Sequence, residues 1–447
     1  MRSATERPNV VLIVADDLGY GDISGYGSTL NRTPAMDALA AQGVRLTDFY
    51  MSSPVCSPSR AALMTGCYPQ RVGLGRGSIA EVLFPGDPIG LNPRVSTMPR
   101  LFLSAGYRTG MVGKWHLGDQ PPFLPTRHGF ERYFGLPYSN NMHPPERWHW
   151  EDGYRFPRLP LLADDDVIEQ DPPQERLTDR YVDWALGFMQ EHAQEAFFLY
   201  VAHMYVHEPI LVPQEYLERS RNGVYGAAVE HLDATVGRLV AFLDDQGLRE
   251  RTIVIVTSDN GSINTRGASN EPLRGAKFET FEGGVRVPCI VSWPGRTREP
   301  VLTDIITAMD LYPTLASACG LEPPGDPIDG IDLTGALFEG FDGTGRRETF
   351  LYYNADTLEA VRVGRWKYHI AGPLYDIVDD VAEAHDLSHR HPEHVQRLLA
   401  VANEAVARFG DRRRGIVGSE SGEPGRVASP RPLTGYIDDA VVAAMYD

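Results

Sequence analysis

The sequence is poor in cysteine and in long apolar runs. Four cysteines among 447 residues are too few for a disulfide framework, so we expect a hydrophobic core to hold the fold. The longest apolar runs, residues 10–15 and 197–202, are far too short to span a bilayer. Hydrophobic residues at 42% and charged residues at 23% are typical of globular proteins. These features argue against both a disordered chain and a membrane-spanning one.

Positive charge is also scarce. Sixty acidic residues against 42 basic residues give a net charge of -18. Such a chain repels phosphate backbones and anionic lipid surfaces, so neither a nucleic acid nor a membrane is expected as a partner. A small anionic ligand would need a local cluster of cations.

The first eight residues are charged and polar and lead directly into an apolar run. This start lacks the hydrophobic stretch of a signal peptide, which predicts a cytoplasmic protein. A periplasmic or secreted protein stays open if a signal peptide has been trimmed.

Short apolar runs alternate with amphipathic segments over the first three hundred residues. This alternation predicts an α/β fold with a large, mostly parallel sheet between helices. The predicted strands are 10–15, 109–112, 197–202 and 253–257, and the predicted helices are 181–191 and 225–245.

A second, smaller unit is predicted at the C-terminal end. Residues 323–345 are rich in glycine, proline and aspartate, which is typical of a connection. Strands over 349–353 and 360–370 and a helix over 392–408 then indicate a small antiparallel sheet with one helix. We therefore expect a catalytic domain over residues 1–345 and a C-terminal subdomain over 346–447, with an extended tail from about residue 410.

Polar side chains follow each of the four predicted strands of the large sheet. They are Asp16 and Asp17, Lys114 and His116, His203 and His207, and Asp259 and Asn260. Ligands of open α/β sheets bind at the carboxyl ends of the strands, so these residues are expected to converge on one crevice. Of the two histidines we favour His207 as functional and expect His203 to be a hydrogen-bonded core residue.

The four oxygen donors Asp16, Asp17, Asp259 and Asn260 suit Ca²⁺ or Mg²⁺ better than zinc. Such pairs also serve as caps and turns after strands. Lys114 and His116 can present a cation and a proton-transfer group to the same site. Lys277 lies in a glycine-flanked loop and could bind an anionic oxygen, although a surface lysine is the alternative.

The densest motif is Cys56-Ser57-Pro58-Ser59-Arg60, which continues without a gap to Gly66. A proline soon after position 56 predicts that this position lies at a helix N-terminus, where free N–H groups favour an anion. Arg60, one turn along, could reach back to position 56. The alternatives are a buried thiol before an ordinary helix and a solvated arginine.

This run resembles the signature of the type I sulfatases, the formylglycine-dependent sulfuric ester hydrolases. Segments 8–22, 113–118, 257–261 and 283–288 resemble further landmarks of that family in the same order, with the arylsulfatase A-like branch nearest. The resemblance implies an alkaline-phosphatase-like fold. It also implies an enzyme that hydrolyses sulfate esters, aryl or carbohydrate, to an alcohol or phenol and inorganic sulfate.

The resemblance also implies roles for single residues. Cys56 would be oxidised to formylglycine (3-oxoalanine) by a maturation enzyme, and its hydrate would be the nucleophile. Modified Cys56 would bind Ca²⁺, with Mg²⁺ as the alternative, together with the four oxygen donors Asp16, Asp17, Asp259 and Asn260. Arg60 would hold the hydrate. Lys114 and Lys277 would bind the sulfate, His116 and His207 would move protons with His207 also contacting the substrate, and Ser139 would contact the substrate.

Two other functions remain open at this point. One is hydrolysis of phosphonate monoesters or phosphodiesters with the same formylglycine. The other is a non-catalytic anion-binding protein in which Cys56 stays unmodified. Segments 74–93 and 140–176 and the tail after Gly410 are expected to shape substrate selection. The pattern leaves both a monomer and a homo-oligomer open.

Overall fold

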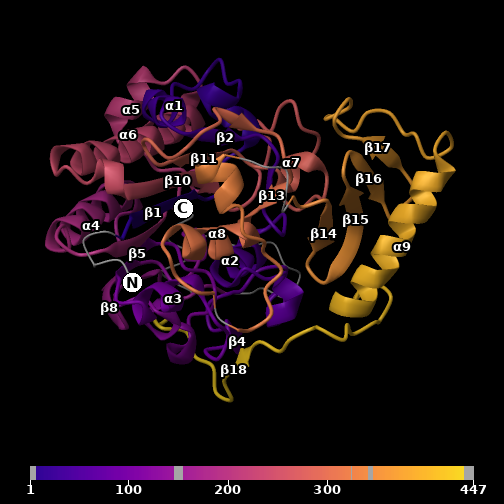
Figure 1. The fold of residues 1–447 in the computed structure, drawn as a ribbon. Coiled ribbons are helices and arrows are strands. Elements are labelled where there is room, and N and C mark those ends of the chain that lie inside the picture. Colours follow the sequence, from indigo (N-terminus) through magenta and orange to yellow (C-terminus); the bar gives the residue numbers. More distant parts are fainter. Residues whose placement is uncertain (1–6, 145–154, 324, 341–345, 437–447) are drawn as a thin grey trace.

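A ten-stranded mixed sheet lies at the centre of the molecule (Figure 1). The computed structural model describes residues 7–144, 155–323, 325–340 and 346–436. The strand order is β12 (Val301–Leu302), β2 (Val44–Leu46), β11 (Cys289–Ser292), β10 (Thr252–Ser258), β1 (Asn9–Ala15), β9 (Phe197–Ala202), β5 (Arg108–Gly113), β6 (Arg132–Gly135), β7 (Pro160–Ala163) and β8 (Asp166–Gln170).

The middle strands of this sheet run parallel. β1 pairs in parallel with β10 and with β9, and β5 pairs in parallel with β9 and with β6. Ala15 lies opposite Ser258, and Ala202 lies opposite both Val14 and Gly113. The carboxyl ends of β10, β1, β9 and β5 therefore lie side by side. All four predicted strands of the large sheet are confirmed, with ends shifted by one residue at most.

Helices cover both faces of the large sheet (Figure 1). Val10, Leu12 and Val14 of β1 face a core that includes side chains of α2 (Cys56–Thr65), α3 (Met98–Ser104) and α8 (Leu311–Ala318). The alternate residues Val11, Ile13 and Ala15 face α1 (Pro34–Ala41), α4 (Leu177–Glu191) and α6 (Gly223–Asp245). Burial on both faces explains why these strands are continuous apolar runs. The predicted α/β architecture is confirmed.

A second sheet of four antiparallel strands lies beside the main body (Figure 1). Its strands are β14 (Thr349–Asn354), β15 (Thr357–Val363), β16 (Trp366–His369) and β17 (Leu374–Asp376), and α9 (Pro392–Phe409) packs on it. The hydrophobic core under this sheet also contains Tyr50 and Ala62 of the main body. The small sheet with one helix is thus confirmed.

Two details of this region differ from the prediction or fall outside it. Residues 360–370 do not form one strand, because Gly364, at φ 59°, turns the chain between β15 and β16. Glycine adopts such a left-handed conformation in a two-residue hairpin turn without steric cost. The domain boundary predicted at residue 345 falls in 341–345, outside the described residues, so it stays a prediction.

After α9 the chain returns to the main body. β18 (Gly425–Arg426) pairs with β4 (Ile89–Gly90), and Figure 1 shows this yellow segment running under the main body. The Val427 N–H donates to the Pro88 carbonyl at 2.9 Å. The short elements β3 (Phe49–Tyr50), β13 (Ile306–Thr307), α5 (Gln214–Arg219) and α7 (Glu282–Val285) complete the fold.

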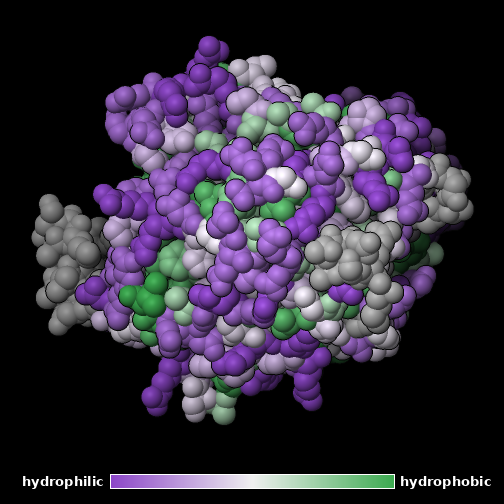
Figure 2. All heavy atoms as spheres, turned by 60° about the vertical axis from the view of Figure 1, so that its left-hand side comes forward, coloured by the Kyte–Doolittle hydropathy of each residue, from purple (hydrophilic) through white to green (hydrophobic). Residues whose placement is uncertain are grey.

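One face of the molecule is mainly polar. Figure 2 shows a largely hydrophilic face with small, separate hydrophobic areas. Among the described residues, no helix combines the length and the apolar character that a membrane span requires.

Candidate active site

The residues that follow the four adjacent strands form one buried cluster. Asp16, Lys114, Asp259 and Asn260 are completely buried, and His116 is 1% exposed. The parallel register of β10, β1, β9 and β5 brings them together, and Asn260 contacts Asp17 from 243 residues away. The convergence predicted from the strand ends therefore occurs.

Two cations neutralise the carboxylates nearest the sheet. The Lys114 Nζ donates to Asp16 Oδ2 at 2.6 Å. The Arg60 Nε donates to Asp259 Oδ2 at 2.9 Å, and its Nη1 donates to the Lys114 carbonyl at 2.8 Å. Arg60 is buried, so it is not a solvated surface arginine.

Asp17 is the second contact centre of the cluster. Its Oδ1 accepts a hydrogen bond from Asn260 Nδ2 at 2.7 Å, and its Oδ2 accepts one from Lys277 Nζ at 2.8 Å. The His207 Nε2 lies 3.8 Å from Asp17 Oδ2. Lys277 is 8% exposed, so the alternative of a surface lysine is wrong.

Ser139 lies between two members of the cluster. The Lys114 Nζ donates to Ser139 Oγ at 3.1 Å, and the same oxygen lies 3.4 Å from His207 Nε2. The structure thus places Ser139 among the predicted site residues.

Cys56 is the first residue of α2 and is almost fully buried. Position 56 therefore lies where helical N–H groups have no partner within the helix and favour an anion. Burial raises the pKa of its thiol above the ordinary value, while Lys114 and Lys277 lower it and Asp16 and Asp259 raise it further. The thiol is consequently protonated at neutral pH, and a thiol is a poor nucleophile.

The two predicted functional histidines each use one ring nitrogen to contact the backbone. His116 Nε2 donates to the Leu83 carbonyl at 2.9 Å, which leaves Nδ1 as the proton acceptor. Among the described residues Nδ1 has no hydrogen-bond partner. His207 Nδ1 donates to the Glu208 carbonyl at 2.6 Å, which turns Nε2 towards the cluster. Burial lowers the pKa of both rings, so both are neutral near pH 7.

His203 has the role expected of a core residue. Its Nδ1 accepts a hydrogen bond from the Tyr205 N–H at 3.0 Å, and the ring is fully buried. His207 is instead the histidine that reaches the cluster.

Two residues of the cluster have strained backbones. Asp17 and His116 both have φ 63°, a left-handed backbone conformation that residues other than glycine seldom adopt. Such strain persists only where the surrounding structure fixes it, and it concentrates at functional sites. The sequence carries no signal for either outlier.

The pKa values of the three buried carboxyl groups shift in different directions. Burial alone would raise the pKa of Asp16 and of Asp17, but the lysines and His207 outweigh it and lower both values. Burial and the neighbouring Asp16 instead raise the pKa of Asp259. Two buried oxygens, Asp16 Oδ1 and Asn260 Oδ1, accept no hydrogen bond from any described residue.

One functional contact could not have been predicted from residue types. The Leu83 N–H donates to Ser57 Oγ at 3.1 Å, while its carbonyl accepts from His116. Leu83 thereby joins the residue after Cys56 to the predicted base. Because it acts through its backbone, its side chain gives no sign of this role.

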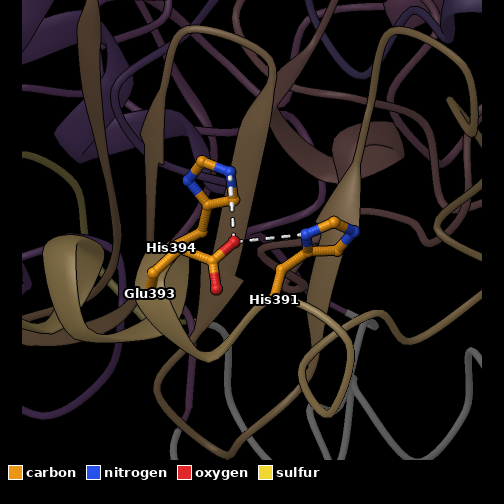
Figure 3. A group of neighbouring side chains, drawn as sticks. All are labelled: His391, Glu393 and His394. Carbon is orange, nitrogen blue, oxygen red and sulfur yellow. Dashed lines mark hydrogen bonds and ion pairs between the residues drawn. The ribbon is translucent and has the colours of Figure 1, made fainter.

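A second group of ligand-type side chains lies at the start of α9 (Figure 3). Glu393 Oε1 is 3.3 Å from His391 Nδ1 and 3.9 Å from His394 Nε2. Both imidazole rings pack on Trp366, with centroid distances of 5.0 and 4.3 Å. An exposed carboxylate at a helix N-terminus is stabilising on its own, so the helix dipole and the packing on Trp366 explain this group.

The chain is similar in sequence and in fold to known proteins. The sequence model of the family described as Sulfatase matches residues 8–321. Arylsulfatase A from Homo sapiens is 40% identical over 385 residues, covering 81% of this chain and 74% of that protein. N-acetylgalactosamine-6-sulfatase from Sus scrofa is 38% identical over 385 residues, covering 82% and 72%. A crystal structure of a sulfatase from Pseudoalteromonas sp. superposes with a TM-score of 0.80 at 26% identity, covering 90% and 91%.

Proposed function

Because the chain belongs to the sulfatase family and is a sulfuric ester hydrolase, we propose that it hydrolyses aryl or carbohydrate sulfates with residue 56 as the nucleophile. Formylglycine made from Cys56 and a Ca²⁺ ion would be its cofactors. One observation carries this proposal: Cys56 starts α2 beside two lysines and a set of four oxygen donors that come from two adjacent strand ends.

The donor set fits a hard divalent cation. The ligand atoms are carboxylate oxygens and one amide oxygen, as Ca²⁺ prefers, and they come from Asp16, Asp17, Asp259 and Asn260. Asp16 Oδ1 and Asn260 Oδ1 are buried and accept no hydrogen bond from a described residue, which is costly unless something binds them. In addition, the three carboxylates are balanced by only three cations, Arg60, Lys114 and Lys277. A divalent cation would give this site the positive charge that a sulfate anion requires.

The unmodified thiol fits the reaction poorly. Burial keeps Cys56 protonated, and a single sulfur nucleophile has no second group through which to release sulfate. When present, the aldehyde hydrate at residue 56 supplies an attacking hydroxyl and Ca²⁺ offsets charge on the sulfate oxygens.

The two lysines bind the sulfate in this proposal. The Lys114 Nζ donates to Asp16, and the Lys277 Nζ donates to Asp17. An anion that enters between them can exchange these contacts for contacts with its non-bridging oxygens. Ser139 Oγ, 3.1 Å from Lys114 Nζ, keeps that amine directed into the site.

The two histidines move protons in this proposal. His116 Nδ1 is unprotonated and free of described partners, so it can take a proton from a hydroxyl on residue 56. His207 Nε2 faces Ser139 and Asp17; once it has taken up a proton, which the neighbouring Asp16 and Asp17 favour, it can protonate the leaving oxygen. Arg60, one turn along α2, donates to Asp259 and to the Lys114 carbonyl. Through these contacts it would hold the hydrate in place.

A formylglycine-generating enzyme is the partner that this proposal requires, and a small sulfate ester is the substrate. The test is a comparison of kcat/KM for an aryl sulfate and an aryl phosphonate, with protein made beside such a maturation enzyme. We expect the sulfate to be preferred and K114M to lose most of that activity. A clear preference for the phosphonate would instead make the chain a phosphonate monoester hydrolase.

A further inference from the structure

The sequence contains only three lysines, Lys114, Lys277 and Lys367. All three are buried, with exposures of 0%, 8% and 0%. Lysine is normally a surface residue and is almost never fully buried unless its charge is paired. Two of the three belong to the candidate active site, which leaves the burial of Lys367 to be explained.

Lys367 lies on β16 and joins the C-terminal sheet to the main body. Its Nζ is 2.8 Å from the Thr280 carbonyl, 3.0 Å from Glu282 Oε1 and 2.9 Å from Glu383 Oε1. Glu383 Oε2 in turn accepts a hydrogen bond from the Glu282 N–H at 2.7 Å. One buried cation thus connects two carboxylates and a backbone carbonyl across the two parts of the molecule.

The contacts of the C-terminal sheet gather on the segment that follows Lys277. Asn354 Nδ2 donates to the Phe278 carbonyl at 2.9 Å. Thr280 Oγ1 donates to Glu359 Oε2 at 2.9 Å. Together with Lys367 these residues fix the backbone at three points over residues 278–282.

The fixed segment includes a strained turn directly beside Lys277. Phe278 has φ 73°, a left-handed conformation that is strained for a residue with a side chain. Its N–H donates to the Pro54 carbonyl at 3.1 Å, two residues before Cys56. Backbone strain of this kind persists only when surrounding contacts hold it. The C-terminal sheet supplies such contacts.

We propose that Lys367 and Asn354 are positioning residues, through which the C-terminal sheet holds segment 278–282 so that Lys277 Nζ stays directed into the active site. This inference rests on the proposed function, because it takes Lys277 to be a sulfate ligand. The competing explanation is that Lys367 and Asn354 only stabilise the contact between the two parts of the molecule.

The experiment measures binding of inorganic sulfate by calorimetry, in a buffer with Ca²⁺, to protein whose Cys56 is unmodified. Binding then needs neither maturation nor turnover. The variants are K277M, N354A and the pair K367M/E383Q, which removes one charge of each sign so that no buried carboxylate loses its only counter-charge. N403A, an exposed asparagine of α9, is the matched control.

We expect K277M to weaken sulfate binding by about tenfold or more, because it removes a charge-assisted contact. N354A and K367M/E383Q should each weaken it by about threefold, because a misplaced amine keeps part of that contact. In the K277M background neither change should weaken binding further, since both act through the same amine. N403A should bind sulfate as the unaltered protein does.

The outcomes separate the two proposals. If K277M weakens sulfate binding but N354A and K367M/E383Q do not, the positioning role is overturned and the proposed function stands. Equal losses in the presence and absence of Lys277 would show a general structural role, which also overturns it. If K277M binds sulfate normally, Lys277 is no sulfate ligand and the positioning role fails with it. Sulfate ester turnover by matured protein then decides separately whether the enzyme assignment holds.

Discussion

At the scale of single residues, the active site is a balance of buried charges. Arg60, Lys114 and Lys277 each contact a buried aspartate within 3 Å. Charges removed from water are costly unless they are paired. These ion pairs therefore stabilise the site. One cation can turn from its aspartate to an incoming anion only while the other ion pairs stay intact.

Removal of Arg60 tests this balance. R60M leaves the buried Asp259 without its nearest cation, so we expect the free energy of unfolding to fall by about 3–5 kcal/mol. Urea denaturation measures the change. R108M, which breaks exposed ion pairs, should leave the unfolding midpoint almost unchanged. Equal effects of the two substitutions would contradict the account.

Residue types predicted most of the candidate site. Aspartates, lysines and histidines directly after apolar strands have few structural reasons to be there, so Asp16, Lys114, His207 and Asp259 stood out. The Leu83 carbonyl and the strained backbone of His116 could not be predicted, because neither depends on a recognisable side chain. Whether these side chains perform their proposed roles stays a prediction.

At the scale of elements, the site depends on segments that are far from it in sequence. The Gly86 N–H donates to Asp119 Oδ2 at 2.7 Å, and Gln120 exchanges hydrogen bonds of 2.9 and 3.0 Å with the Arg431 backbone. β18 also pairs with β4 just after Gly86. The returning tail thus secures the loop that carries Leu83, the partner of His116.

Loosening that tail should slow the reaction. Q120L removes both contacts with Arg431, so we expect kcat on an aryl sulfate to fall about tenfold through misplacement of His116, with KM little changed. Steady-state kinetics measures both parameters. R426A, at an exposed side chain of β18 in the same tail, is the control. A change in KM alone would mean that the tail acts on substrate binding.

Long buried strands were easier to predict than short ones. β1, β5, β9 and β10 are continuous apolar runs, whereas β2 and β12 have three and two residues and no periodicity to detect. Their pairing is set by contacts more than 200 residues away. The hairpin at Gly364 was missed although the apolar alternation changes phase there, from Val361 and Val363 to Trp366 and Tyr368.

At the scale of the whole molecule, the described residues form three hydrophobic cores. Several ionisable side chains are buried within them. Burial lowers the pKa of His128 from its ordinary value of 6.5 to about 3, and its ring packs on Trp115 at 5.5 Å. The folded protein therefore keeps this ring neutral where the unfolded chain binds a proton.

Acid should consequently destabilise the protein through His128. Between pH 6.5 and pH 3 the unfolded chain binds the extra proton, so stability falls as pH falls. From pH 7 to pH 5 we expect the unaltered protein to lose about 2 kcal/mol relative to H128F. Denaturation at the two pH values measures this difference. The same comparison with H385Q, which alters an exposed ring, should show no such difference from the unaltered protein.

The mass of the tryptic peptide over residues 46–60, which contains residue 56, shows whether formylglycine forms. We expect protein active on sulfate esters to carry this peptide about 18 Da lighter than its coded mass, as formylglycine requires. Activity should rise in proportion to the lighter fraction across preparations. Full activity with only the coded mass at residue 56 would contradict the account.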